Sequence, residues 1–522
     1  MAGCWKNGEN MLAELRKENR ASLFLLSLIL LMSLGLSLSL ISWGLPYYLH
    51  PDEQFVVTNT MRMGENGFLP TNSIYPPLMF YTHLALYGAY FIVLNATGEV
   101  AGFGDFADFY HSHLSNFFIL SRSLAVLASL LTLILVYVFA KKISKSSKAA
   151  LLAAFLLAVS PGFVASSALI KADIFIALFF LLSLYYLAYK NEKIRWIALF
   201  TALATSLNYY GLFIVPAVVA GFFLLKQKNR AIPYLKYVIL FGFVLNFIFL
   251  LNFSQGVNDV MHVLSMVKDR VSSVCIPFWE GNQFFGIWEG FGVPALFAAA
   301  GLIYFWRKKK TEHELLGISG LSFIFLLSLI SAREPRYSIA VYPLIAILAG
   351  AAIIKGYEYL KEVRKPGYIK AAYVLLVALA LIFPAQVTYS LVTNTDSRLV
   401  SAGWIKENIP KDSVIATEAY GPTLDSEFYY TWGYTGKGPD NAGDYYLIKS
   451  YYVTDKNFYG ADYIILSSLA SDKSRYFCDK KPLETYDAIR NCPLINSWSA
   501  EPANFWFHNP AINLYSNCLK HG

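Results

Sequence analysis

Long runs of apolar residues, separated by short polar segments, dominate the first three quarters of the sequence. The first run covers residues 21–43. A helix needs about 20 apolar residues to cross the hydrocarbon core of a bilayer, so these runs predict transmembrane helices, about eleven in all. The other predicted spans are 117–140, 149–163, 168–189, 195–209, 211–226, 235–253, 290–306, 313–331, 336–354 and 370–391.

The apolar run at 77–95 is predicted not to cross. Lys and Arg are enriched on the cytoplasmic side of membrane proteins, which places both the N-terminus and the basic cluster at 141–148 there. Between these two cytoplasmic segments the chain must cross the membrane an even number of times. Three apolar runs lie between them, so one of these runs does not cross. The run at 77–95 contains His83 and many tyrosines, a composition typical of the membrane interface. We therefore predict that 44–116 is an external loop with interfacial helices, and that the C-terminal part is also external.

Residues 392–522 differ from the rest because they are polar and rich in Tyr, Asp, Asn and Gly. Val414–Ala416 and Tyr463–Leu466 have the composition of strands, and 404–410 resembles a short helix that ends at a proline. The predicted fold is mainly α: a polytopic transmembrane domain at 1–391, followed by a small external α/β domain.

Composition supports this assignment and excludes one class of function. The chain is 56% hydrophobic and only 15% charged, which is unusual for a soluble protein of 522 residues. Its net charge of +8 comes from short basic clusters between apolar runs, where they set topology. A nucleic-acid partner is therefore not expected. The first apolar run is long for a signal peptide, so we expect a retained anchor in the cell membrane.

Four cysteines are predicted to lie outside, and Cys4 inside. The external cysteines are Cys275, Cys478, Cys492 and Cys518. They permit two disulfides in three connectivities, but unpaired thiols fit the sequence equally well.

The stretch His50-Pro51-Asp52-Glu53 follows the first span directly. Carboxylates so close to hydrocarbon are costly unless they are hydrated, paired or used, and a partly desolvated one can act as a general base. Asp52 and Glu53 are neighbours and do not share a helix face, so we expect different roles for them. The alternative is that they simply favour a helix N-terminus. His50 could join them in binding a divalent cation, although a lone histidine beside acidic residues is more often a simple hydrogen-bond partner.

Three further charged sites are predicted on the same side of the membrane. Asp173 lies at the outer end of a span, and Arg122 opens another span from the outside. Arg333 and Arg336 form an external basic pair, which runs against the usual charge bias. Guanidinium groups suit a phosphate, although pairing with Glu334 or anchoring at lipid headgroups would also explain this pair. For Arg122, anchoring at headgroups is the favoured alternative, and for Asp173 it is a bridge with Lys171 to the headgroups.

Carboxylates and arginines on one side of a membrane fit a specific reaction. A hydroxyl acceptor would attack an activated donor that is linked to phosphate and held in the membrane. A carboxylate would take the acceptor proton, and arginines would stabilise the departing phosphate.

At these residues the chain resembles the GT-C membrane glycosyltransferases, specifically their protein O-mannosyltransferase-like group. The resemblance covers roughly 46–350. It depends on His50-Pro51-Asp52-Glu53, Tyr75-Pro76-Pro77-Leu78, Leu120-Ser121-Arg122, Val159-Ser160-Pro161, Lys171-Ala172-Asp173-Ile174, Arg336-Tyr337 and Tyr342-Pro343. The chain departs from similar proteins at Leu207-Asn208-Tyr209, where they often have Thr-Lys-Tyr, and at Tyr75, where some have Lys.

The resemblance implies a polyprenyl-phosphate sugar donor and an inverting hexosyl or pentosyl transfer to a hydroxyl acceptor on a protein, glycan or lipid. It implies catalysis by the pair Asp52 and Glu53, support from Asp173, and a position near the lipid phosphate for Arg336 and Tyr337. The Trp-Trp-Asp signature of oligosaccharyltransferases is absent, so we expect transfer of a single sugar. The competing class is a transporter or lipid flippase, which would need polar residues near the bilayer midplane and alternating access.

Overall fold

The computed structural model is mainly helical and forms two compact units. One unit contains the apolar helices between Arg20 and Thr388, and the other combines Ser42–Gln54 with the residues from Tyr389 onward. The described residues are 18–70, 75–190, 192–247, 257–258, 261, 265, 284–309, 311–330, 335–363, 366–418, 420–424, 435–436, 445–450, 458, 460–474, 480–500, 502, 505–506 and 508–519.

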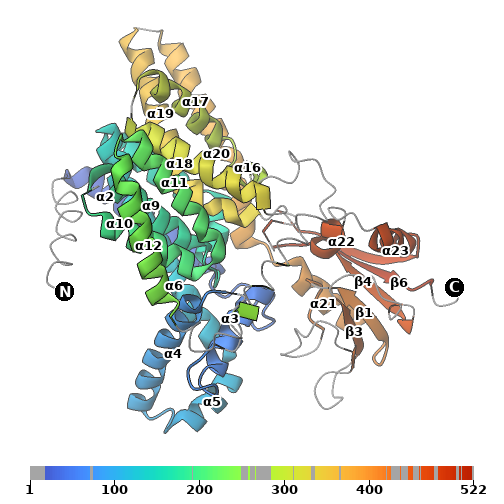
Figure 1. The fold of residues 1–522 in the computed structure, drawn as a ribbon. Coiled ribbons are helices and arrows are strands. Elements are labelled where there is room, and N and C mark those ends of the chain that lie inside the picture. Colours follow the sequence, from blue (N-terminus) through green and yellow to red (C-terminus); the bar gives the residue numbers. More distant parts are fainter. Residues whose placement is uncertain are drawn as a thin grey trace. The chain divides into compact units, whose positions relative to one another are not determined.

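Figure 1 shows the helices of the first unit packed into a bundle. The elements up to the end of this bundle are α2 (Arg20–Leu40), α3 (Pro51–Arg62), α4 (Pro77–Thr97), α5 (Phe103–Ser112), α6 (Leu114–Ser144), α7 (Ser147–Ala158), α8 (Pro161–Ser167), α9 (Asp173–Tyr189), α10 (Ile194–Leu207), η1 (Tyr209–Phe213), α11 (Ile214–Leu224), η2 (Lys228–Arg230), α12 (Ala231–Leu245), α16 (Phe284–Phe291), α17 (Pro294–Arg307), α18 (Thr311–Ile330), η3 (Pro335–Val341), α19 (Tyr342–Glu362) and α20 (Gly367–Thr393).

The lengths and surfaces of these helices are those of a multi-pass membrane protein. Apolar side chains of α2 face outward, with Phe24 63% and Leu31 62% exposed, as expected for a surface in contact with lipid. In the described part of the chain, six helical stretches are long and apolar enough to cross a membrane, or seven if α7 and α8 form one bent span. The six are Arg20–Leu40, Pro77–Thr97, Leu114–Ser144, Thr311–Leu329, Arg336–Glu362 and Gly367–Asn408. The count of eleven crossings stays a prediction.

One of the predicted spans has a different form in the structure, and one predicted interfacial segment is a long helix. The span expected at 149–163 is two helices, α7 and α8, which meet at an angle of 65°. Pro161 opens α8, and a proline disfavours helical geometry at the residue before it, which explains the break. The expected interfacial run at 77–95 is the single 21-residue helix α4. Since α4 is apolar enough to cross, its interfacial position stays a prediction.

Small residues and hydroxyl groups bring the helices of the first unit together. A Cβ atom on Gly350 of α19 would lie 2.7 Å from the Ala149 carbonyl oxygen of α7, so only glycine permits this approach. The Ser37 hydroxyl of α2 lies 2.7 Å from the Ser167 hydroxyl of α8. Both kinds of contact are typical of membrane helices, which cannot rely on the hydrophobic effect to associate within lipid.

The second unit contains a mixed β-sheet. Its strands in the described residues are β1 (Val414–Glu418), β2 (Thr435–Gly436), β3 (Tyr446–Ser450), β4 (Tyr463–Ser467), β5 (Leu494–Trp498) and β6 (Ile512–Ser516), in the order β2-β3-β1-β4-β6-β5. Strand β1 pairs in parallel with β3 and β4, and β6 pairs antiparallel with β4 and β5. The strands predicted at Val414–Ala416 and Tyr463–Leu466 are thereby confirmed. The predicted domain boundary at 391 falls inside α20 and stays a prediction.

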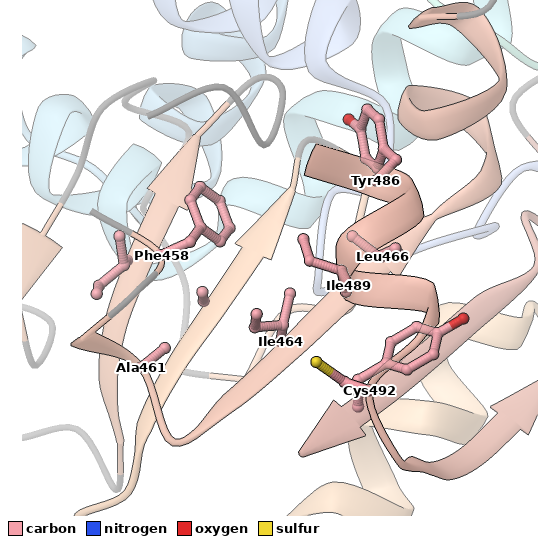
Figure 2. Packing of buried hydrophobic residues seen from close by; sticks show 10 residues of the cluster. Phe458, Ala461, Ile464, Leu466, Tyr486, Ile489 and Cys492 are labelled. Atoms are coloured by element: carbon pink, nitrogen blue, oxygen red, sulfur yellow. The ribbon is translucent and has the colours of Figure 1, made fainter. Parts of the chain in front are cut away.

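Helices of the second unit provide two separate cores, one on each face of this sheet. Successive residues of a strand point to opposite faces. Ile464 and Leu466 therefore pack with Tyr486 and Ile489 of helix α23 (Lys480–Arg490), as Figure 2 shows. Ile465 between them faces the other core, which contains Ala402 and Ile405 of helix α21 (Ser397–Asn408). The helix expected at 404–410 is thus the last part of the longer α21. A short helix, α22 (Ser468–Ser474), directly follows β4.

A disulfide joins Cys492 to Cys518, 26 residues further along the chain. It ties the loop before β5 to the segment after β6. Cys492 is also part of the core shown in Figure 2. The other cysteines, Cys4, Cys275 and Cys478, lie outside the described residues.

We expect the double substitution Cys492→Ser/Cys518→Ser to destabilise this sheet. Opening a loop of this length removes about 3 kcal/mol of stabilisation. Hydrogen exchange at the amides of β4 and β6 should accelerate in detergent-solubilised protein. Dithiothreitol should have the same effect on the wild type and no further effect on the double variant. Equal exchange rates in the untreated wild type and the variant would show that the disulfide does not stabilise the sheet.

Candidate functional site

The stretch His50–Glu53 forms the N-terminus of α3. Pro51 is the first residue of the helix, and Asp52 and Glu53 lie in its first turn. The His50 ring caps this turn, because its Nδ1 accepts a hydrogen bond from the Asp52 amide at 3.2 Å. The His50 carbonyl oxygen also accepts one from the Glu53 amide at 3.2 Å. Only Nε2 of His50 is then left as a possible metal ligand.

The two adjacent carboxylates have different surroundings. Glu53 is fully buried, as is His50, whereas Asp52 is partly exposed. Neighbours on a helix point about 100° apart, so one of them can face the interior of the protein while the other faces outward. The acidic pair was predicted either to act in catalysis or to favour a helix N-terminus. The two roles are compatible, since the pair opens a helix and also presents a carboxylate at the surface.

A second group of candidate residues lies within the first unit. Asp173 is the first residue of α9, where a carboxylate is favoured by the helix dipole. It is buried, and its Oδ1 accepts a hydrogen bond of 2.5 Å from the hydroxyl of Tyr210 in η1. The Tyr210 ring lies 4.6 Å from the ring of Tyr337 in η3, measured between centroids.

Arg336 extends this chain of contacts. Its Nη2 lies 3.4 Å from the Tyr337 hydroxyl, to which it donates a hydrogen bond, and its guanidinium carbon lies 5.1 Å from the Tyr337 ring centroid. The structure therefore connects Asp173, Tyr337 and Arg336 through Tyr210. We call these four residues the Asp173–Arg336 chain.

Tyr210 is a member of this chain that the sequence analysis missed. It follows Asn208 and Tyr209 in a short polar break between two apolar runs, and that break is the signal that could have revealed it. The close approach of η1 to α10 requires Gly211, since a Cβ atom there would lie 2.5 Å from the Ala204 carbonyl oxygen.

Arg122 has a contact that involves neither of these two groups. Arg122 is fully buried in α6, and its Nη1 donates a hydrogen bond of 2.8 Å to the carbonyl oxygen of Ile41 at the C-terminus of α2. This position explains Arg122 as a cap for α2 and disfavours headgroup anchoring, while substrate binding by Arg122 stays a prediction. Arg333 and Glu334 lie outside the described residues.

A metal centre is not evident in the described ranges, which contain no group of three or more His, Cys, Asp or Glu side chains that could hold an ion. Within these ranges the structure thus identifies no ligand set for the divalent cation that His50 could help to bind.

Comparison with known proteins confirms the resemblance inferred from sequence. The family described as dolichyl-phosphate-mannose-protein mannosyltransferase matches residues 83–258 of the chain. This match includes α6, α9 and η1, and therefore Asp173 and Tyr210. An uncharacterised protein of Aquifex aeolicus is 27% identical over 271 residues, which are 49% of this chain and 53% of that one. The matched region thus spans about half the length of this relative.

The fold of this chain is similar to that of a solved oligosaccharyltransferase. The apo oligosaccharyltransferase of Archaeoglobus fulgidus aligns over 87% of this chain and 70% of its own, at 13% identity and a TM-score of 0.52. The ArnT structure from Cupriavidus metallidurans, bound to undecaprenyl phosphate, aligns over 96% of this chain and 99% of its own, at 12% identity and a TM-score of 0.47.

We expect Tyr210→Phe to destabilise the first unit more than Tyr234→Phe does. Both tyrosines are buried, but Tyr234 donates to the neutral hydroxyl of Thr201 at 3.1 Å. Hydrogen bonds to charged groups contribute about 1.5–3 kcal/mol, against about 0.5–1.5 kcal/mol for neutral pairs. Unfolding of the two variants in mixed detergent micelles, followed by circular dichroism, measures the difference. Equal losses would mean that Asp173 gains no charge-assisted bond from Tyr210.

Proposed function

We propose that this protein is an inverting glycosyltransferase that moves a sugar from a polyprenyl-phosphate donor to a hydroxyl acceptor. The observation that carries the proposal is the buried pair of Asp173 and Tyr210, both within the region that matches the dolichyl-phosphate-mannose-protein mannosyltransferases. Dolichyl phosphate is a polyprenyl phosphate, so that family is the reason to propose this class of donor. Mannose is accordingly the first sugar to test.

The proposed reaction is a single displacement at the anomeric carbon. The acceptor oxygen forms a bond to this carbon while the bond from the carbon to the phosphate oxygen breaks. The electron pair leaves with the polyprenyl phosphate, and the acceptor proton passes to a carboxylate. One displacement inverts the anomeric configuration.

Asp52 is our proposed general base, and its partial exposure supports this choice over Glu53. A base must come within hydrogen-bond reach of the acceptor hydroxyl, which is easier for the partly exposed Asp52 than for the fully buried Glu53. We assign to Glu53 the role of holding the first turn of α3 in place. His50 supports the same turn through its hydrogen bond with the Asp52 amide.

The Asp173–Arg336 chain is our proposed donor site. Guanidinium groups bind phosphate oxygens through paired hydrogen bonds, and Arg336 is only partly buried, which leaves it accessible to a ligand. Asp173 and Tyr210 would fix the Tyr337 ring against which Arg336 lies. Arg122 and Arg333 remain further candidate ligands for the donor.

We propose that the protein lies in the cell membrane with its N-terminus in the cytoplasm. The reaction would then take place on the opposite, external side of the membrane. The disulfide between Cys492 and Cys518 supports this side for the second unit, because disulfides persist in oxidising compartments and are rare in the cytosol.

We expect Asp52→Asn to lower kcat by about 10²–10⁴-fold, because it removes the group that takes the acceptor proton. Transfer from a synthetic polyprenyl-phosphate mannose, measured in proteoliposomes with an extract of the host membrane as acceptor, gives the rate. Asp108→Asn is the matched control, since Asp108 is an exposed carboxylate in the same predicted loop. Full activity in Asp52→Asn would exclude Asp52 as the base.

We expect Arg336→Lys to raise KM for the donor about tenfold, because lysine keeps the charge but loses the planar fork of donors. The control is Arg307→Lys, at an exposed position at the end of α17. Donor titrations at a fixed acceptor concentration separate KM from kcat. An unchanged donor KM would contradict the assignment of Arg336 to the phosphate.

A further inference from the structure

A buried arginine of the second unit binds the backbone directly in front of the acidic pair. Arg398 is fully buried, and its Nη1 donates a hydrogen bond of 3.0 Å to the carbonyl oxygen of Leu49. The next residue is His50, which caps the first turn of α3. The contact joins residues 349 positions apart in the chain, within the same compact unit.

Asp396 holds the Arg398 guanidinium in a fixed orientation. Its Oδ1 accepts from Arg398 Nε at 2.8 Å, and its Oδ2 accepts from Arg398 Nη2 at 2.9 Å. The Arg398 amide adds a bond of 3.0 Å to Oδ1, and the Asn509 amide adds one of 3.1 Å to Oδ2. A bidentate pair with additional backbone donors has little freedom to rotate.

A second contact holds the start of the same segment. The Arg398 guanidinium carbon lies 5.4 Å from the ring centroid of Trp43. Trp43 also contacts His508, and the centroids of these two rings lie 4.0 Å apart. Arg398 thus contacts the segment from Trp43 to Leu49 at both of its ends.

Fold stability alone does not explain a buried ion pair at this position. The desolvation of two charges often exceeds their attraction, and apolar residues of similar volume are frequently as stabilising. An ion pair whose polar groups are all hydrogen-bonded provides a directed donor for one particular carbonyl group. A pair of apolar residues cannot do this.

We propose that Asp396 and Arg398 are positioning residues that orient the first turn of α3 and so place the Asp52 carboxylate. Arg398 fixes the Leu49 carbonyl oxygen. The peptide bond between Leu49 and His50 thereby restricts the position of His50, which accepts hydrogen bonds from the Asp52 and Glu53 amides. The catalytic part of this inference rests on the proposed function, whereas the structural part does not.

The test compares Arg398→Lys with the double variant Asp396→Asn/Arg398→Met. The double variant removes both charges, so no single buried charge is left to unfold the protein. Arg490→Ala is the control, because Arg490 forms a surface pair with Asp487 in the same unit. Each full-length protein is examined by hydrogen exchange and by sugar transfer from polyprenyl-phosphate mannose.

We expect faster exchange at the amides of Leu49, His50, Asp52 and Glu53 in the double variant, with β1 and β4 unchanged. A displacement of about 1 Å at a catalytic group can cost about 10²-fold in rate, so kcat should fall by that order while the donor KM stays constant. Arg398→Lys should retain part of the wild-type kcat, because lysine still offers one donor to Leu49. The Arg490→Ala control should match the wild type in both measurements.

Hydrogen exchange separates this inference from the proposed function. Unchanged exchange at 49–53 in the double variant would overturn the positioning role, whatever the activity. Faster exchange with a normal kcat would equally overturn it, provided that Asp52→Asn is inactive. If the wild type transfers no sugar, the proposed function fails, and faster exchange confined to 49–53 would still support the structural role of the pair.

Discussion

A carboxylate that leaves water must receive hydrogen-bond donors in exchange, and this requirement shapes three polar sites among the described residues. Asp173 receives the Tyr210 hydroxyl at the start of α9. Asp396 receives the Arg398 guanidinium and two backbone amides. Glu418, at the end of β1, receives the Tyr486 hydroxyl and the Ser467 amide. Because an unsatisfied buried charge costs several kcal/mol, each of these carboxylates dictates the geometry of the groups around it.

The same requirement leaves some charged side chains more accessible to a ligand than others. Arg122 is buried, and its guanidinium group donates a hydrogen bond to the carbonyl oxygen of Ile41 at the end of α2. Arg336 is only partly buried and lies beside an aromatic ring, which is how an arginine is kept oriented and still accessible to a ligand. Two arginines that look equivalent in the sequence therefore differ in what they can bind.

Local patterns predicted much of the fold. The apolar runs identified the membrane helices, and the strand-like composition of Tyr463–Leu466 identified β4, because these signals depend only on neighbours in sequence. The break at Pro161 depends on local sterics and was foreseeable from the proline itself. The number of crossings depends on how each helix is oriented in the bilayer. Composition alone does not determine this orientation, as the apolar 21-residue helix α4 illustrates.

Long-range contacts explain what the sequence analysis missed. Tyr210 matters because it meets Asp173, 37 residues away, and Arg398 matters because it meets Leu49 across most of the chain. The polar break beside Tyr210 marks its position but does not indicate its partner Asp173, and the neighbours of Arg398 do not indicate its contact with Leu49. The acidic pair itself was recognisable from its place beside a span, but the different burial of Asp52 and Glu53 follows from a helix start that is fixed from outside the segment. A short helix has little intrinsic stability, so the direction of α3 depends on the contacts at its N-terminus. The backbone contact of Arg398 directly in front of the His50–Glu53 stretch is therefore informative for the proposed chemistry, even though Arg398 is far from this stretch in sequence.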